Sequence, residues 1–190
     1  MAKTRPSRGP RARLFIALEP ARADRETLAA WRDQLVAGRE DLRPVAAQAL
    51  HVTLVFLGWQ DERDAERIAG AARDAAGGFE PARLTPSAVK PVPPRGVRIF
   101  ALDLADEAGR ATAVHEALSG ALAAEGLYRP EKRPFWPHMT LARVKRGRRA
   151  PSLDADELPP PLTASGVTLY RSTLRPQGAV YDPLGGFELA

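Results

Sequence analysis

A short strand-like pattern that occurs twice constrains this chain most strongly. His-Val-Thr-Leu occupies residues 51–54, and His-Met-Thr-Leu occupies residues 138–141. The Leu, Val and Phe residues around both histidines favour β-strands. Because alternate residues of a strand point to the same face, each segment presents an imidazole beside a hydroxyl. Two such pairs that face each other would form a symmetric site.

These groups are suited to cleaving a phosphodiester without a metal ion. One neutral imidazole takes a proton from the attacking oxygen, and the other, protonated, gives a proton to the leaving oxygen. Histidine fits both tasks because its ordinary pKa is about 6.5. Threonine hydroxyls can donate hydrogen bonds to the non-bridging oxygens, where charge builds up. We therefore predict two catalytic residues, His51 and His138, and two phosphate-binding residues, Thr53 and Thr140.

Simpler uses of these histidines compete with catalysis. A strand histidine can be a hydrogen-bonded core residue, but strict alternation puts His51 opposite one apolar face formed by Leu50, Val52, Leu54 and Phe56. Metal binding is a second alternative, yet a motif without carboxylate in a chain without Cys is a poor ligand set. We expect no metal and no cofactor. The third histidine, His115, falls within a predicted helix and is interpreted as a partly exposed structural residue.

Together with three further segments, the two motifs resemble the 2H phosphoesterase superfamily. The similarity is to its bacterial and archaeal RNA 2′,3′-cyclic phosphodiesterases, long called 2′-5′ RNA ligases. The further segments are residues 13–18, 169–172 and 180–184. The resemblance implies hydrolysis of 2′,3′-cyclic phosphate ends of RNA or nucleotides to 2′-phosphomonoesters, with weak reverse 2′-5′ ligation. It also implies two pseudo-symmetric lobes, each an antiparallel sheet with outer helices, with the active-site cleft between them.

Other functions stay open at this point. Hydrolysis of ADP-ribose 1″,2″-cyclic phosphate or of 2′-5′ oligonucleotides would use the same histidines with a different pocket. A non-catalytic RNA-binding module would use the basic residues and aromatic side chains instead. The sequence also leaves open which histidine is the base. Nearby cations disfavour an imidazolium, and a basic cluster surrounds the second motif, which weakly favours His138 as the base.

Four more residues are candidate substrate contacts. The resemblance implies that Arg143 binds phosphate, but strict alternation puts it on the face opposite His138, so the strand must bulge or end, or the contact comes from another direction. Phe15 and Tyr170 are candidates for stacking on a base, with core packing as the alternative. Trp136 either covers the base or plugs the interface between the lobes.

Composition narrows the class of protein and its partners. The net charge of +5 favours a polyanion, and a cluster of cations adjoins the second motif: Lys132, Arg133, Arg143, Lys145, Arg146, Arg148 and Arg149. The absence of Cys excludes disulfides and thiol catalysis. No apolar run is long enough for a membrane span, and residues 1–12 lack a secretory h-region. We expect a flexible basic tail at 1–12, one bilobal domain at 13–190, and a cytoplasmic monomer without an obligate protein partner.

Hydrophobic periodicity and turn residues predict an α+β fold. Strands are predicted at 13–19, 49–57, 97–104, 138–144, 163–174 and 180–189, with extended pieces near 43–45 and 82–94. Helices are predicted at 21–36, 61–76 and 107–125, the last two capped by Asp61 and Asp106. The strand at 49–57 is expected to stop at Gly58, and residues 147–161 are expected to form a linker.

Overall fold

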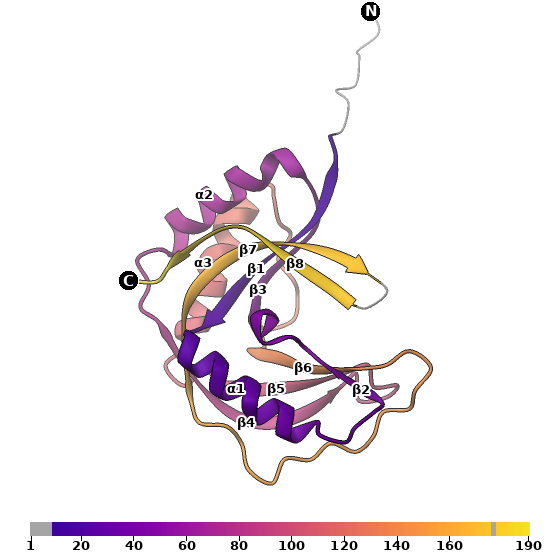
Figure 1. Ribbon diagram of the computed structural model, residues 1–190. Helices are drawn as coiled ribbons and strands as arrows, with labels where there is room; N and C mark the ends of the chain where they lie inside the picture. Colours follow the sequence, from indigo (N-terminus) through magenta and orange to yellow (C-terminus); the bar gives the residue numbers. More distant parts are fainter. Residues whose placement is uncertain (1–8, 176–177) are drawn as a thin grey trace, which may run out of the picture.

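The computed structural model describes residues 9–175 and 178–190 and has an α+β fold, as predicted (Figure 1). Every strand pairing in these residues is antiparallel. Two 3₁₀ turns, Ala47–Ala49 and Glu62–Asp64, precede β3 and α2. The helices and strands in chain order are β1 Arg11–Pro20, α1 Arg22–Leu35, β2 Leu42–Pro44, β3 Val52–Asp61, α2 Ala65–Ala76, β4 Ala82–Val92, β5 Ile99–Ala105, α3 Arg110–Ala124, β6 His138–Val144, β7 Leu162–Arg175 and β8 Gly178–Glu188.

The strands form two four-stranded regions that meet at two seams. One region has the order β3-β1-β7-β8, and the other has the order β2-β6-β5-β4. At one seam Val52 of β3 pairs with Met139 of β6, and at the other β4 pairs with β7. The two regions therefore curve toward each other in a C-shaped arrangement (Figure 1), which confirms the predicted pair of lobes.

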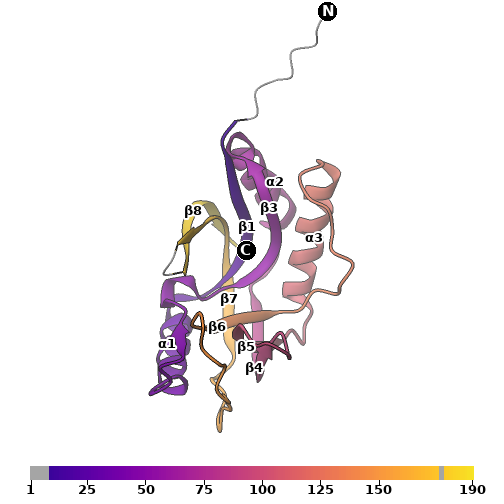
Figure 2. The same ribbon diagram turned by 90° about the vertical axis from the view of Figure 1, so that its right-hand side faces the viewer.

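Helices cover the outer faces of both lobes, as expected. The helix α2 contacts β7 and β8, and α3 packs beside α2 and against β3. The helix α1 serves the other lobe, where Val36 at its end packs with Leu42, Phe100 and Ala142 in a separate apolar cluster. Figure 2 shows α1 and α3 on opposite sides of the molecule. The apolar stripe of α1 was predicted correctly, with Leu28 fully buried against the main core.

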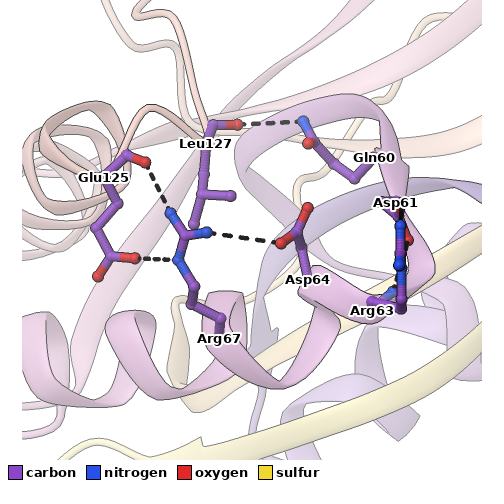
Figure 3. A network of polar contacts seen from close by, with 7 residues as sticks. All are labelled: Gln60, Asp61, Arg63, Asp64, Arg67, Glu125 and Leu127. Carbon is purple, nitrogen blue, oxygen red and sulfur yellow. Dashed lines mark hydrogen bonds and ion pairs between the residues drawn. The ribbon is translucent and has the colours of Figure 1, made fainter. Parts of the chain in front are cut away.

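In the lobe that contains β3, a polar network connects α2 and the end of α3 to the C-terminal end of that strand (Figure 3). Arg67 of α2 donates to the Glu125 carboxylate at 2.7 Å and to the Glu125 carbonyl oxygen at 2.8 Å. This guanidinium satisfies a carbonyl at the C-terminal end of α3, where a positive charge is also favourable. Gln60 of β3 donates to the Leu127 carbonyl oxygen at 3.1 Å. The end of β3 and both helices are thereby held as one unit.

Several element boundaries differ from the sequence prediction. The strand β1 begins at Arg11, within the segment predicted as tail, and residues 1–8 of that tail lie outside the described residues. The strand β3 does not stop at Gly58 but continues to Asp61, because a glycine at φ +69° tolerates the irregular pairing there. Asp61 caps the 3₁₀ turn, and the Asp106 carboxylate accepts the backbone N–H groups of Ala111 and Thr112 at the start of α3.

Candidate active site

The seam between the two lobes brings all four motif residues together. Val52 and Met139 are paired and buried, so the residues beside them point the other way, out of the core. Continuing the antiparallel register by one position puts His51 opposite Thr140, and Thr53 opposite His138. The hydroxyl of each motif therefore lies next to the histidine of the other motif.

An extra residue in each motif strand changes which side chains face this site. On β3 the pairing skips Leu54, so Leu54 and Val55 are both buried and Phe56 is 39% exposed. On β6 it skips Leu141, and Leu141 and Ala142 are both buried. The sequence prediction that Phe56 belongs to the apolar core face is therefore wrong, because a bulge reverses the alternation.

The matching bulge on β6 resolves the position of Arg143. This residue shares two hollows in the surface with His51 and Thr53, so the bulge alternative is confirmed. The residue five positions after the histidine faces the site in both motifs: it is Phe56 in the first and Arg143 in the second. The two strands thus share one local distortion but place different chemistry beside their histidines.

The backbone fixes the same tautomer in both imidazoles. His51 Nδ1 lies 2.8 Å from the Ala49 carbonyl oxygen, and His138 Nδ1 lies 2.8 Å from the Trp136 carbonyl oxygen. A carbonyl oxygen only accepts, so Nδ1 must carry a proton in both rings. In the neutral ring Nε2 is then the unprotonated, basic nitrogen, and in His51 it accepts a hydrogen bond from the Thr53 hydroxyl at 3.2 Å. Each histidine therefore has Nε2 available for proton transfer.

Three aromatic rings pack together on one side of His51, and we call them the aromatic box. They are Phe15, Tyr181 and Tyr170, with ring centroids at 5.1, 5.4 and 6.4 Å from that of His51. Burial lowers the pKa of His51 to about 4 despite the hydrogen bond to the Ala49 carbonyl oxygen, and the coulombic interactions with His138, Arg143 and Arg25 act in the same direction as burial. The ring is therefore neutral near pH 7, which suits a general base. The burial of His51 thus favours the assignment opposite to the one that the basic cluster suggested.

His138 has a different neighbour. Its ring stacks on Trp136 with a centroid distance of 4.0 Å and an interplanar angle of 13°. The Trp136 indole N–H donates to the Asp103 carboxylate, which also pairs with Lys90. Burial alone would raise the pKa of Asp103, but the hydrogen bonds from Lys90 and Trp136 outweigh it and lower the pKa. The Trp136 indole is thus held flat against the histidine, and its two predicted roles, covering the base or plugging the interface between the lobes, stay predictions.

Two groups of hollows flank the four motif residues, and Thr53 lines both groups. The basic hollow contains Arg43, Arg143 and Tyr181 beside His51 and continues to Arg13 and Arg175, and no Asp or Glu lines it among the residues that the structure describes. The aromatic hollow contains Phe56, Phe135 and Trp136 beside His138. The basic hollow is suited to a phosphate and the aromatic hollow to a flat ring.

Several lining residues escaped the sequence interpretation. Arg13 lies two residues before Phe15 on β1, so strand alternation could have placed it on the site face. Arg43 and Tyr181 come from other parts of the sheet and only the fold brings them here. His115 was correctly interpreted as partly exposed: its Nδ1 lies 2.7 Å from the Leu54 carbonyl oxygen, and its ring stacks on Phe135.

The structure restricts the two proposed base-stacking residues. Phe15 is only 4% exposed, and its ring contacts both Tyr170, at a centroid distance of 5.3 Å, and His51. Its edge still lines the basic hollow. Tyr170 donates its hydroxyl to Glu19 and lines none of the described site hollows. Both side chains pack near His51, and base stacking on either ring stays a prediction.

Three further findings concern the basic cluster, metal-binding side chains and the length of the helices. Of the basic cluster near the second motif, Arg143 and Arg133 line the hollows, whereas Lys145, Arg146, Arg148 and Arg149 lie in an exposed segment after β6. Among the described residues, no group of three His, Cys, Asp or Glu side chains is placed to hold a metal ion. No helix in residues 9–175 and 178–190 has the length and apolarity needed to cross a membrane.

Comparisons with known proteins agree with this architecture. The chain is 31% identical over 188 residues to an RNA 2′,3′-cyclic phosphodiesterase of Escherichia coli K12, covering 90% of this chain and 93% of the relative. It is 29% identical over 184 residues to an RNA 2′,3′-cyclic phosphodiesterase of Methanothermobacter thermautotrophicus, covering 93% and 98%.

Solved structures show the same fold. The crystal structure of TT0787 of Thermus thermophilus matches with a TM-score of 0.79 and 28% identity, covering 93% of this chain and 97% of the other. Apo LigT of E. coli matches with a TM-score of 0.72 and 26% identity, covering 94% and 98%. The family model of the 2′-5′ RNA ligase superfamily matches residues 18–174. With this match across most of its length, the chain belongs to the 2′-5′ RNA ligase superfamily, as its resemblance to the 2H phosphoesterases implied.

Proposed function

We propose that this protein hydrolyses 2′,3′-cyclic phosphate ends of RNA or nucleotides to 2′-phosphomonoesters by two-histidine acid–base catalysis. The observation that carries the proposal is the shared tautomer of His51 and His138, each with Nδ1 bound to a backbone carbonyl and Nε2 left for proton transfer. The names of the curated relatives supply the substrate class. Beside His51 lies a hollow lined by arginines, which suits an anionic substrate.

In the proposed reaction, His51 is the base and His138 is the acid. His51 Nε2 accepts a proton from water as the water oxygen forms a bond to phosphorus. The bond between phosphorus and O3′ breaks in line with this attack, and protonated His138 gives its Nε2 proton to O3′. The lowered pKa of His51 keeps it neutral and able to accept the proton. Proton exchange with water then restores both rings, and the same steps in reverse would give weak 2′-5′ ligation.

The threonines and Arg143 stabilise the negative charge that develops on the non-bridging phosphate oxygens. Thr53 and Thr140 donate hydroxyl hydrogen bonds to the non-bridging oxygens, from opposite strands of the seam. Arg143 adds a cationic donor from the same hollow. Isosteric Thr53→Val and Thr140→Val variants remove one donor each and should lower kcat more than they raise KM. Thr27→Val on α1, whose hydroxyl binds the Ala23 carbonyl outside the site, is the matched control.

Other activities predict different results. Hydrolysis of ADP-ribose 1″,2″-cyclic phosphate or of 2′-5′ oligonucleotides would use the same histidines, and product analysis separates them from the proposed reaction. A non-catalytic RNA-binding module predicts RNA binding without turnover. The matched tautomers favour an enzyme, because binding alone does not require two equivalent Nε2 atoms. The monomeric state and the cytoplasmic location remain predictions from the sequence.

The decisive experiment measures hydrolysis of a 2′,3′-cyclic nucleotide and of a short RNA with a cyclic end in excess EDTA. Wild type is compared with His51→Ala and His138→Ala, with thermal melting to verify folding. We expect a 2′-phosphate product with wild type and a loss of roughly 10²- to 10⁴-fold in each variant. Unchanged turnover in either folded variant would refute the two-histidine scheme. If folded wild type cleaves neither substrate, the proposed reaction is refuted.

A further inference from the structure

Beyond the catalytic site, one face of β1 and β3 carries alternating aromatic and cationic side chains. Phe56 lies at the edge of both hollows and is 39% exposed. The Arg13 guanidinium lies over the Phe56 ring, 4.6 Å from its centroid. Farther along the strands come Trp59, which is 59% exposed, and Arg11, which donates to the Trp59 carbonyl oxygen. We call Phe56, Arg13, Trp59 and Arg11 the strand track.

A second bulge in β3 aligns this track. Phe56 and Trp59 are three positions apart, so a regular strand would place them on opposite faces. The pairing shifts between Leu14 and Phe15 of β1, and Gly58 has φ +69° at that point. Trp59 then pairs directly with Arg13, so both side chains lie on one face. An irregularity in the strand thus presents two aromatic rings and two arginines on the same surface.

A tryptophan exposed to this extent beside arginines suits a partner with flat rings and negative charge. Single-stranded RNA has both, because its bases stack on aromatic side chains and its phosphates pair with cations. The carboxylate of Asp61, the register partner of Arg11, is held by Arg63 at 2.7 Å, which leaves the two arginines as the charge of the track. We propose that the strand track binds the single-stranded RNA that precedes the cyclic end. This proposal rests on the proposed function for the position of the reacting phosphate.

The length of the track sets the kind of substrate. Thr53 and Trp59 pair with Ala17 and Arg13, which are four residues apart on β1, so about 14 Å of sheet separates them even with both bulges. A single nucleoside held at the phosphate site does not span this distance, whereas an oligonucleotide does. The enzyme should therefore prefer an RNA of several nucleotides over a cyclic mononucleotide, and Trp59 should be a main source of that preference.

The first test measures binding independently of turnover. Fluorescence anisotropy gives the Kd of a 5′-labelled hexaribonucleotide with a 3′-phosphate for wild type, Trp59→Ala, Trp59→Phe and Leu158→Ala. Leu158 is a matched control because it is an exposed apolar side chain in the segment between β6 and β7. We expect Kd to rise on the order of tenfold in Trp59→Ala, to recover largely in Trp59→Phe, and to stay unchanged in Leu158→Ala.

The charge of the track has its own test. The slope of log Kd against log salt should fall by about 0.7 in Arg11→Gln, because one phosphate contact is lost. Arg83→Gln, at an exposed position of β4, should keep the wild-type slope. Polyglutamate serves as a competitor that has charge but no bases. If it displaces the labelled hexamer as effectively as unlabelled RNA does, the track recognises only charge and the stacking role is overturned.

Kinetics then separate this proposal from the proposed function. The ratio of kcat/KM for a cyclic-ended hexamer to that for a cyclic mononucleotide should be above one in wild type and should fall on the order of tenfold in Trp59→Ala. Equal turnover of both substrates, together with equal Kd in Trp59→Ala and Leu158→Ala, would overturn the track and leave the phosphodiesterase standing. Binding that depends on Trp59, without turnover in folded wild type, would support the track and refute the proposed reaction.

Discussion

His51 and His138 occupy equivalent places in two similar strands, yet their surroundings differ. Each ring is oriented by the carbonyl oxygen two residues earlier, and each strand bulges after the threonine. The His51 ring, however, packs on one side against three aromatic side chains and lines the hollow that contains Arg143. The His138 ring stacks flat on one indole that is tied to a carboxylate.

This difference shows how one motif can supply two opposite proton-transfer roles. The strand and the backbone hydrogen bond set the ring position and tautomer, which are the same in both halves. Burial and neighbouring charge set the preferred protonation state, and these come from elsewhere in the fold. Burial without a negative partner favours neutral His51, whereas His138 contacts a single indole. The predictions below test this division of roles.

The largest expected effect separates the base from the acid. In a cyclic substrate with sulfur in place of the bridging O3′, the leaving group is a thiolate, which needs no protonation. His138→Ala should then recover most of the roughly 10²- to 10⁴-fold activity lost on the oxygen substrate, whereas His51→Ala should not. Single-turnover rates on both substrates measure the effect. Recovery in His51→Ala instead would reverse the two roles.

Arg143 and Phe56 occupy the same place after their histidines and should affect different parameters. Arg143→Ala removes a cationic phosphate donor, so KM should rise by about 10- to 100-fold. Phe56→Ala leaves that donor in place and should alter nucleotide preference more than phosphate binding. Steady-state kinetics, with Arg83→Ala as the matched control, measure both effects. Unchanged KM and kcat in Arg143→Ala would remove this residue from the site.

The pH dependence tests the aromatic box. Protonated His51 cannot accept a proton, so kcat/KM should fall as pH drops through the His51 pKa of about 4. Tyr181→Leu opens the box and should raise this pKa toward about 6.5, which lowers kcat/KM at pH 5 by about tenfold. NMR titration of the His51 ring checks the assignment. An acidic limb near pH 6.5 in wild type would contradict the burial argument.

The same lowered pKa predicts a change in stability with pH. Above about pH 6.5 the ring is neutral in both the folded and unfolded states, so its contribution to stability is complete. Between about pH 6.5 and 4 the unfolded chain binds a proton that folded His51 resists, so the free energy of unfolding should decrease as pH falls. Denaturant melts of wild type and His51→Gln across this window should show a smaller decrease in the variant.

The smallest expected effect concerns the Trp136 indole that stacks on His138. Trp136→Leu removes the indole that stacks on the His138 ring and holds its orientation, and kcat should fall by about 2- to 30-fold, with partial recovery in Trp136→Phe. The acidic limb from His51 should not move, because Trp136 is not part of its box. A change in KM alone would indicate instead that Trp136 contacts the substrate.

Much of the fold and the centre of the site follow from sequence patterns. Period-two alternation and glycine punctuation locate the main strands and helices, because these signals are local. The paired His-x-Thr segments identify the four residues that the seam brings together. The sequence does not reveal the bulges at Leu54 and Leu141, since strand pairing decides which residue is skipped.

The sequence by itself determined the reactive groups: two imidazoles, each with a hydroxyl two residues later in a strand. Only the tertiary structure decided how these groups are tuned. Tyr181 brings an aromatic ring beside His51 from the far end of the chain, the bulge turns Arg143 into the basic hollow, and Asp103 holds the indole beside His138. The physical reason is that side-chain identity and spacing are local properties, whereas burial, charge and ring stacking depend on residues distant in sequence.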